Sequence, residues 1–352
     1  MTQRPKVQPA ADATAERKDQ HLQICLEEPV YAGHGNGFAA FRFDHDALPE
    51  IALSDVDTSI VLFGKQLSAP LIIGAMTGGT TRAGRLNRIL AEAAEATQIG
   101  MALGSQRGMI EDPATANSYD MRPYAPSTLL FGNLGAVQLN YGVDAAQIQA
   151  CIERSAVDAL NLHLNPLQEA IQPEGNTDFR GLIAKIAALA PQLSVPLLLK
   201  EVGAGISETT AKKIAQLPIA GVEVAGVGGT SWAKIEAFRR QDDVKRQSGL
   251  QLADWGVPTA ESLEICQRLL ADKRLIASGG MRSGLELAKA LALGADAAAM
   301  AMPFLEAAQD GVAAVVTRIE QIIDELKTVM FVCGCRTIDE LRTKATLRRT
   351  SQ

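Results

Sequence analysis

The amino-acid sequence predicts an α/β fold, specifically a (β/α)8 barrel. Short aliphatic runs without apolar/polar alternation recur eight times after residue 70, as expected of parallel strands that are buried on both faces. Segments with helical apolar spacing separate these runs, and the alternation covers about 235 residues, close to the roughly 250 of a typical barrel. Aromatic residues make up only 4% of the chain while 30 residues are glycine, which favours packed α/β layers over a β-sandwich.

Each predicted strand is an apolar run that ends at a glycine or a polar residue. A doubly wound open sheet is the alternative architecture, but such sheets carry an early GxGxxG turn that this sequence lacks. The predicted strands are residues 71–76, 99–103, 128–133, 159–165, 196–202, 221–225, 274–278 and 297–302. The predicted helices are residues 82–98, 144–154, 178–189, 207–217, 260–270, 283–293 and 305–327.

Several regions fall outside this alternation. Residues 1–16 are polar and rich in Ala and Pro, so we expect them to be disordered. Residues 17–335 are predicted to form one domain that begins with an N-terminal extension at 17–68. Residues 336–352 are expected to form a polar C-terminal tail. The connection at 230–258, after the sixth strand, is long and charged, which is typical of a lid over a site.

Composition argues against several classes of partner. The net charge of −6 disfavours nucleic acid. The most apolar late stretch, residues 285–305, is interrupted by charged residues, and the first twenty residues contain no apolar segment. We therefore expect neither a membrane span nor a secretory signal. The five cysteines are scattered without a CxxC pair, which predicts a reduced, cytoplasmic protein.

Glycine-rich turns follow the last strands, where barrels commonly hold phosphate. Gly279 and Gly280 lead directly into the helix that starts near Ser283, whose N-terminus carries partial positive charge. A second turn, at residues 228–230, precedes them along the chain. These glycines could simply make tight turns, but the pair of turns favours a phosphate site.

Charged residues at other strand ends suggest further ligands. Lys200 ends a buried strand, so its ammonium must face either an anion in the site or a carboxylate such as Glu201. Glu169 could hold Mg²⁺ together with substrate oxygens, although a lone exposed glutamate is often merely solvated. Arg17 and Lys18 form a basic pair that could likewise be a solvated face. With cations from two further strand ends, Arg107 and Arg282, they indicate a substrate with two or more negative charges.

Eight motifs resemble those of one family, the flavin-dependent type 2 isopentenyl diphosphate isomerases, which interconvert isopentenyl and dimethylallyl diphosphate in isoprenoid biosynthesis. The resemblance spans roughly residues 17–335. The motifs are RKDQH (17–21), APLIIGAMTGG (69–79), GSQRG (104–108), HLNPLQE (163–169), KEVGAGIS (200–207), GVGGTSW (226–232), WGVPTA (255–260) and SGGMRSG (278–284).

This resemblance implies FMN, Mg²⁺ and NADPH as the reductant of FMN, a diphosphate substrate, and a homotetramer or homo-octamer with no nucleic-acid or membrane partner. Gln168 would be catalytic and Glu169 would bind Mg²⁺. The implied FMN contacts are Ala75, Met76, Thr77, Ser105, Asn133, Lys200, Thr230, Gly280, Met281, Arg282, Ala301 and Met302. The implied substrate contacts are Arg17, Lys18, Ser105, Gln106, Arg107, His163, Asn165 and Gln168.

Moving an allylic double bond requires the addition of a proton at one carbon and the loss of a proton from another. The strand ends offer no obvious pair of carboxylates for these transfers, so we hypothesise that reduced flavin shuttles the proton while Gln168 orients or relays it. An FMN-dependent 2-hydroxy-acid oxidase is one alternative, but such enzymes need a histidine after the sixth strand and this chain has none beyond His163. The second alternative is a non-catalytic barrel that only binds FMN.

Overall fold

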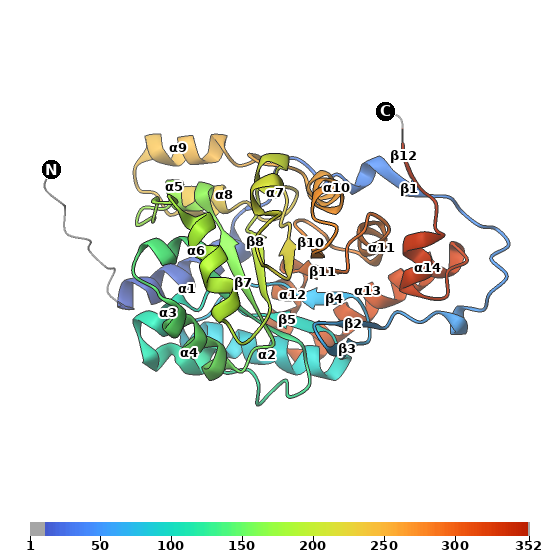
Figure 1. The fold of residues 1–352 in the computed structure, drawn as a ribbon, viewed down its shortest axis with the longest axis horizontal. Coiled ribbons are helices and arrows are strands. Elements are labelled where there is room, and N and C mark those ends of the chain that lie inside the picture. Colours follow the sequence, from blue (N-terminus) through green and yellow to red (C-terminus); the bar gives the residue numbers. More distant parts are fainter. Residues whose placement is uncertain (1–10, 351–352) are drawn as a thin grey trace, which may run out of the picture.

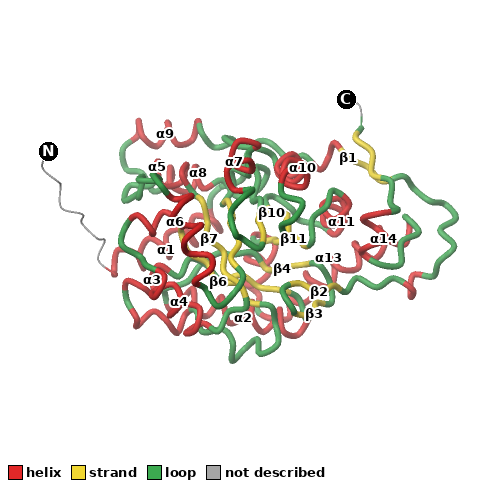
Figure 2. The backbone as a smooth tube through the Cα atoms, in the orientation of Figure 1, coloured by secondary structure: helices red, strands yellow, loops and turns green. Residues whose placement is uncertain are grey.

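The computed structural model describes residues 11–350 and shows a closed barrel of eight parallel strands (Figures 1 and 2). Every barrel strand pairs with its neighbour in chain order, and the last barrel strand returns to pair with the first. The predicted barrel and all eight of its strands are therefore confirmed. The barrel strands are β4 (Leu71–Ile73), β5 (Gly100–Ala102), β6 (Leu130–Gly135), β7 (Ala159–Leu164), β8 (Leu197–Glu201), β9 (Gly221–Glu223), β10 (Arg274–Ser278) and β11 (Ala297–Met300).

Helices surround the barrel and connect its strands (Figure 2). Six of the seven predicted helices match single helices of the described chain, whereas the last prediction, 305–327, divides into α12 and α13 at Gly311, which has a φ of 93°. The connecting helices are α2 (Thr81–Thr97), α3 (Arg107–Glu111), α4 (Ala145–Ser155), α6 (Leu182–Leu189), α7 (Glu208–Ile214), α10 (Thr259–Leu269) and α11 (Gly284–Ala292), followed by α12 (Met302–Ala307) and α13 (Val312–Val332).

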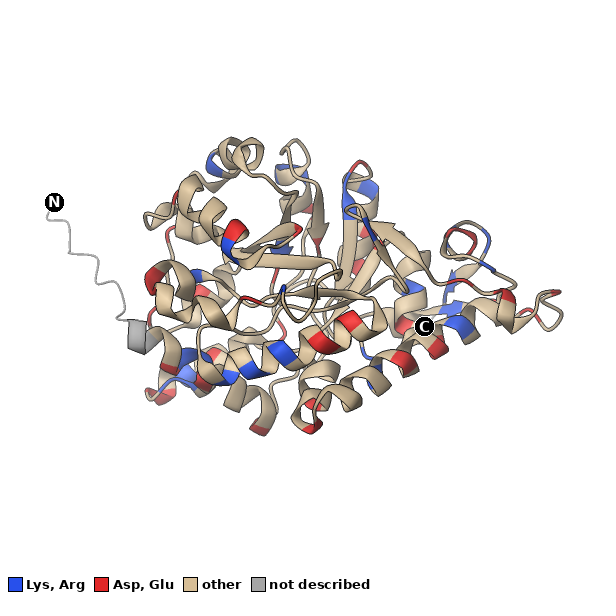
Figure 3. Cartoon of the chain, turned by 90° about the horizontal axis from the view of Figure 1, so that it is seen from below, with Lys and Arg blue, Asp and Glu red and all other residues tan. Residues whose placement is uncertain are grey.

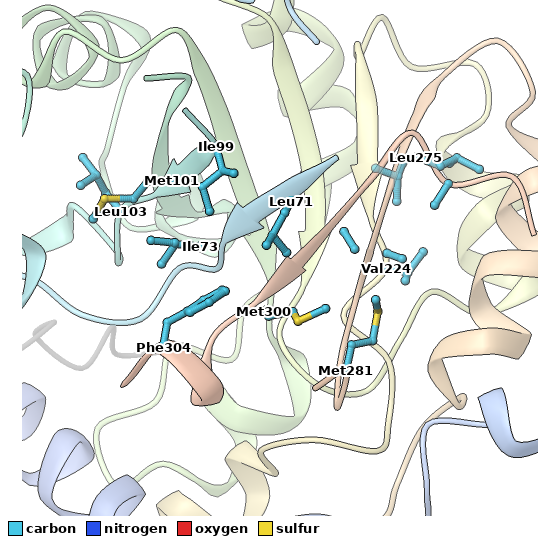
Figure 4. Close-up of a cluster of buried hydrophobic side chains, with 14 of the residues drawn as sticks. Leu71, Ile73, Ile99, Met101, Leu103, Val224, Leu275, Met281, Met300 and Phe304 are labelled. Atoms are coloured by element: carbon cyan, nitrogen blue, oxygen red, sulfur yellow. The ribbon is translucent and has the colours of Figure 1, made fainter. Parts of the chain in front are cut away.

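Alternating strand residues build two separate apolar layers. Ile72 of β4 points into the barrel with Phe131, Leu198 and Ile276, whereas the flanking residues of β4 face the helices. Figure 4 shows part of this outer layer, with Leu71 and Ile73 among side chains from several strands. A hairpin of β2 (Ile60–Leu62) and β3 (Lys65–Leu67) adds Leu62 and Leu67 to the inner cluster. The apolar runs lack alternation because both layers exclude water.

The N-terminal extension contributes α1 (Ala11–Glu27). Residues 11–16, which we expected to be disordered, therefore belong to a helix, while the rest of that expectation lies outside the described residues. α1 contacts α3 and α8, so tertiary packing stabilises a segment whose polar sequence does not predict a helix.

The connection at 230–258 contains short helices, and the C-terminal segment differs from expectation. The connection is largely helical, with α8 (Trp232–Phe238) and α9 (Asp243–Gln251), and short helices α5 (Pro166–Ile171) and α8 pack together. Within the expected polar tail, α14 (Ile338–Thr343) buries Ile338 and Leu341 in the outer core. β12 (Leu347–Arg349) then pairs antiparallel with β1 (Phe41–Phe43) of the extension.

Among residues 11–350, no helix combines the length and apolar character needed to cross a membrane.

Because Leu341 is fully buried, we predict that Leu341→Ala lowers the free energy of unfolding by about 2–5 kcal/mol. Asp339→Ala, on the exposed face of the same helix, should change it by less than about 0.5 kcal/mol. Urea denaturation of both variants measures the difference. Equal stabilities would show that the C-terminal segment contributes nothing to the fold.

Candidate active site

A cavity opens at the carboxyl ends of the barrel strands, where parallel barrels place their chemistry. Of the site residues predicted from the sequence, the cavity is lined by all except Gln106. Those lining residues are Arg17, Lys18, Ala75, Met76, Thr77, Ser105, Arg107, Asn133, His163, Asn165, Gln168, Glu169, Lys200, Thr230, Gly280, Met281, Arg282, Ala301 and Met302.

The two glycine-rich turns pack against each other at one side of this cavity. A Cβ atom on Gly229 would lie 2.5 Å from the backbone nitrogen of Gly280, and one on Gly280 would lie 2.1 Å from the carbonyl oxygen of Gly228. Side chains are therefore excluded, and the backbone forms the surface beside the N-terminus of α11, which Ser283 caps. This arrangement fits a phosphate group.

A second feature of the wall also fits a bound polar ring system. The Thr77 hydroxyl oxygen is buried and, within the described part of the chain, lacks a hydrogen-bond partner. Asn133 reaches the same cavity from β6, and its Oδ1 lies 2.8 Å from His163 Nδ1. Burial and the nearby Lys200 and Lys18 charges lower the pKa of His163 to about 3, so the imidazole is neutral.

Lys200 is paired inside the protein. Its Nζ lies 2.5 Å from Oε1 of Glu223, a buried residue of β9 that the sequence analysis missed. Lys200 thus has a carboxylate partner, as one of the two predicted alternatives required, but the partner is Glu223 rather than Glu201. The Glu201 carboxylate instead accepts the backbone N–H groups of Val202 and Ala204.

Three buried cations lie in the part of the cavity formed by α1 and α3. Arg17, Lys18 and Arg107 are each at most 9% exposed. Lys18 Nζ donates to the Ser105 carbonyl at 2.8 Å and also contacts the Tyr119 hydroxyl. Burial, reinforced by the Arg17 charge, lowers the pKa of Lys18 to about 7.

The pKa of Arg17 is lowered as well, mainly by burial and to a smaller extent by the charge of Arg107. Arg107 has an acidic partner, Glu111, at 2.6 Å. On the outer helices acidic and basic side chains are interspersed (Figure 3), whereas here cations gather in a place from which water is largely removed. A multiply charged anion would relieve their repulsion.

Gln168 is held at both ends of its amide. The Asn165 amide donates to Gln168 Oε1 at 3.1 Å, and Gln168 Nε2 donates to Glu236 Oε1 at 3.0 Å. Glu236 is completely buried on α8, with His21 Nε2 at 3.0 Å and Arg239 Nη1 at 2.7 Å.

Burial alone would raise the pKa of Glu236, but His21 and Arg239 outweigh it and hold the pKa at about 2. Sequence reasoning missed Glu236, because it lies in a charged segment. A signal existed in its position among the buried residues Ala233 and Ala237 at helical spacing.

Glu169 is buried rather than solvated. Its carboxylate accepts the Asn165 amide at 3.0 Å and the Asn176 backbone N–H at 2.6 Å. Burial raises its pKa, and the hydrogen bonds only partly offset this. In residues 11–350 no group of three or more His, Cys, Asp or Glu side chains could hold a metal, so any cation on Glu169 would need oxygens from a ligand.

Gln106 is the one predicted site residue that the structure places elsewhere. It is 1% exposed and does not line the cavity. Its Oε1 accepts the Asn133 backbone N–H at 3.0 Å, and its Nε2 donates to the Ser155 hydroxyl at 2.8 Å. The Gln106 side chain therefore lends no support to the expected contact with the substrate, which stays a prediction. The side chain links β6 to α4 because it points away from the cavity.

Comparison with known proteins first defines the class. The family model of FMN-dependent dehydrogenases matches residues 136–349, so this is a barrel of the FMN-dependent class. Two solved structures share the fold with TM-scores of 0.68. A lactate oxidase of Pediococcus acidilactici has 17% identity, covering 99% of this chain and 97% of that one. A flavocytochrome b2 variant has 19% identity, covering 97% and 84%. At such low identity, both comparisons establish the fold alone.

Curated relatives then give the particular family. An isopentenyl-diphosphate delta-isomerase of a Nostoc species is 47% identical over 337 residues, 96% of each chain. The enzyme of the same name from a Synechococcus species is 46% identical over 340 residues, 96% of this chain and 98% of that one. This chain belongs to the isopentenyl-diphosphate delta-isomerase family.

The lowered pKa of Lys18 predicts a pH dependence of anion binding. A bound anion raises that pKa, so binding above about pH 7 requires uptake of a proton, and affinity should fall there by up to tenfold per pH unit. Calorimetry with inorganic pyrophosphate tests this. The Lys18→Arg variant keeps its positive charge, so its affinity for pyrophosphate should fall less steeply with rising pH. The same variant serves as the correction for the titration of pyrophosphate itself. Identical pH profiles of the two proteins would contradict the assignment.

Proposed function

We propose that this chain interconverts isopentenyl and dimethylallyl diphosphate, using reduced FMN and Mg²⁺, in isoprenoid biosynthesis. The observation that carries the proposal is the single cavity that combines glycine phosphate turns with a separate cluster of buried cations. One anion site suits the phosphate of FMN, and Arg17, Lys18 and Arg107 suit a diphosphate. A barrel that only bound FMN would have no use for the second site.

Reduced FMN would supply an electron-rich ring that stabilises positive charge and exchanges a proton. The residues proposed to hold it are the turn Gly280–Arg282, Thr77 with its unpartnered hydroxyl, and Lys200. A 2-hydroxy-acid oxidase remains the less suitable activity. The sequence has no histidine after His163, which lies in the cavity with its pKa lowered to about 3 and would be a poor base.

Gln168 is proposed to orient the reacting carbons or relay the proton. Its amide cannot rotate freely, because Asn165 donates to its oxygen while Glu236 accepts from its nitrogen. The remaining N–H of Gln168 is then held in a defined direction. Such fixed orientation gives the stereochemical control that an allylic proton transfer requires.

Glu169 is proposed to bind Mg²⁺ together with diphosphate oxygens. A cation would stabilise the charged carboxylate, whose pKa is raised by burial. Asn165 and the Asn176 backbone already orient both carboxylate oxygens. NADPH as the reductant of FMN, assembly as a homotetramer or homo-octamer, and a cytoplasmic location remain predictions from the resemblance. Free thiols at all five cysteines are consistent with the last.

The decisive experiment is an isomerase assay with isopentenyl diphosphate, from which FMN, Mg²⁺ and NADPH are omitted in turn. Gln168→Ala should retain FMN absorbance but lose on the order of 10²-fold or more in kcat. Gln192→Ala, at an exposed site, serves as the control and should retain full activity. If wild-type protein with all three cofactors does not isomerise the substrate, the proposed function is wrong. If only Gln168→Ala turns over normally, its catalytic role is wrong.

Glu169→Gln should raise the Mg²⁺ concentration needed for half-maximal activity by at least about tenfold, since the amide loses the charge and can keep only one of the two accepted hydrogen bonds. Titration of activity with Mg²⁺ measures this. Glu208→Gln on the exposed start of α7 should leave the titration unchanged. An unaltered Mg²⁺ requirement in Glu169→Gln would place the metal on other groups.

A further inference from the structure

The described cavity contains a buried ion pair in which one member, the carboxylate, has no role in the proposed function. Lys200 and Glu223 are register partners on the adjacent strands β8 and β9, so their side chains leave the barrel wall at the same height. Both line the cavity, both are at least 92% buried, and their charged atoms are 2.5 Å apart.

Other groups fix the carboxylate in this position. The Ser278 hydroxyl donates to Glu223 Oε1 at 2.9 Å, and Asn161 donates to Oε2 at 3.3 Å. The Ser278 oxygen in turn accepts the Ala225 backbone N–H at 3.1 Å. Glu223 therefore cannot turn away from Lys200 without leaving buried donors unsatisfied.

We infer that Glu223 is a positioning residue that cancels the charge of Lys200 beside the flavin and thereby tunes the flavin's reduction potential. The inference rests on the proposed function, in which Lys200 contacts FMN. An uncompensated ammonium would stabilise the negative charge that the ring gains on reduction. It would also oppose the cation-like state through which an allylic isomerisation passes. Pairing with Glu223 removes both effects while leaving Lys200 able to donate hydrogen bonds.

The test is the midpoint potential of bound FMN, measured anaerobically against a reference dye at fixed pH. Glu223→Gln keeps the shape of the side chain and, through its one oxygen, the contacts with Lys200 and Ser278. It loses the hydrogen bond accepted from Asn161 and frees the positive charge of Lys200. We expect its equilibrium constant for two-electron reduction to rise at least tenfold, a shift of about 30 mV to more positive potential. Ser278→Ala removes the hydrogen bond to Glu223 and the one accepted from Ala225 without changing charge, and should shift the constant less than threefold.

A double-mutant cycle separates action through Lys200 from a direct effect of the carboxylate. In a Lys200→Met background Glu223 would be an unpaired buried acid and would become protonated, so Glu223→Gln should then change the potential little. If Glu223→Gln loses FMN, Glu223→Asp is the second variant. It keeps the charge but moves it back from Lys200, and should shift the potential in the same direction by less.

No shift in the wild-type background, or equal shifts in both backgrounds, would overturn the inference. These outcomes are distinct from failure of the proposed function, because the potential is measured without substrate. If wild-type protein isomerises isopentenyl diphosphate while Glu223→Gln leaves the potential unchanged, only the role of Glu223 is rejected. If wild-type protein binds FMN but does not isomerise, the proposed function fails while the potentials still decide whether the charges are coupled.

Discussion

The parallel register of the closed barrel is the constraint on which the site depends. Because all eight strands run in the same direction, residues far apart in sequence leave the wall at one rim. His163, Lys200 and Glu223 illustrate this, since each is the register partner of the next across β7, β8 and β9. The helices and the two apolar layers keep that register, and a slip of one residue would turn these side chains out of the cavity.

Charge at this rim is arranged in two different ways. Lys200 has a full carboxylate partner in Glu223, and Arg239 has one in Glu236. Arg17 and Lys18 instead lie in a place where burial, and then a neighbouring cation (Arg107 for Arg17, Arg17 for Lys18), lowers the pKa of each. The first arrangement is stable without a ligand, whereas the second becomes favourable when an anion supplies the missing charge. The contrast separates the paired charges inside the barrel from the cations that are proposed to bind the substrate.

The extension and the segment 230–258 complete the site rather than merely covering it. α1 contributes Arg17, Lys18 and His21, and α8 contributes Glu236, which holds the Gln168 amide. The strand ends alone would present Gln168 with one end of its amide unsupported. The segment predicted from its length and charge to be a lid also supports Gln168 through Glu236.

The sequence by itself determined the barrel, because apolar runs buried on both faces have a pattern that no solvent-exposed sheet can carry. It also determined which residues at the rim follow the strand ends, and the family, through eight motifs. Tertiary structure alone decided which carboxylate meets Lys200, that Glu236 supports Gln168, that Gln106 points away from the cavity, and that residues 11–16 are helical. Pairing between elements distant in sequence depends on barrel register and helix packing. Local pattern contains no information about these long-range contacts.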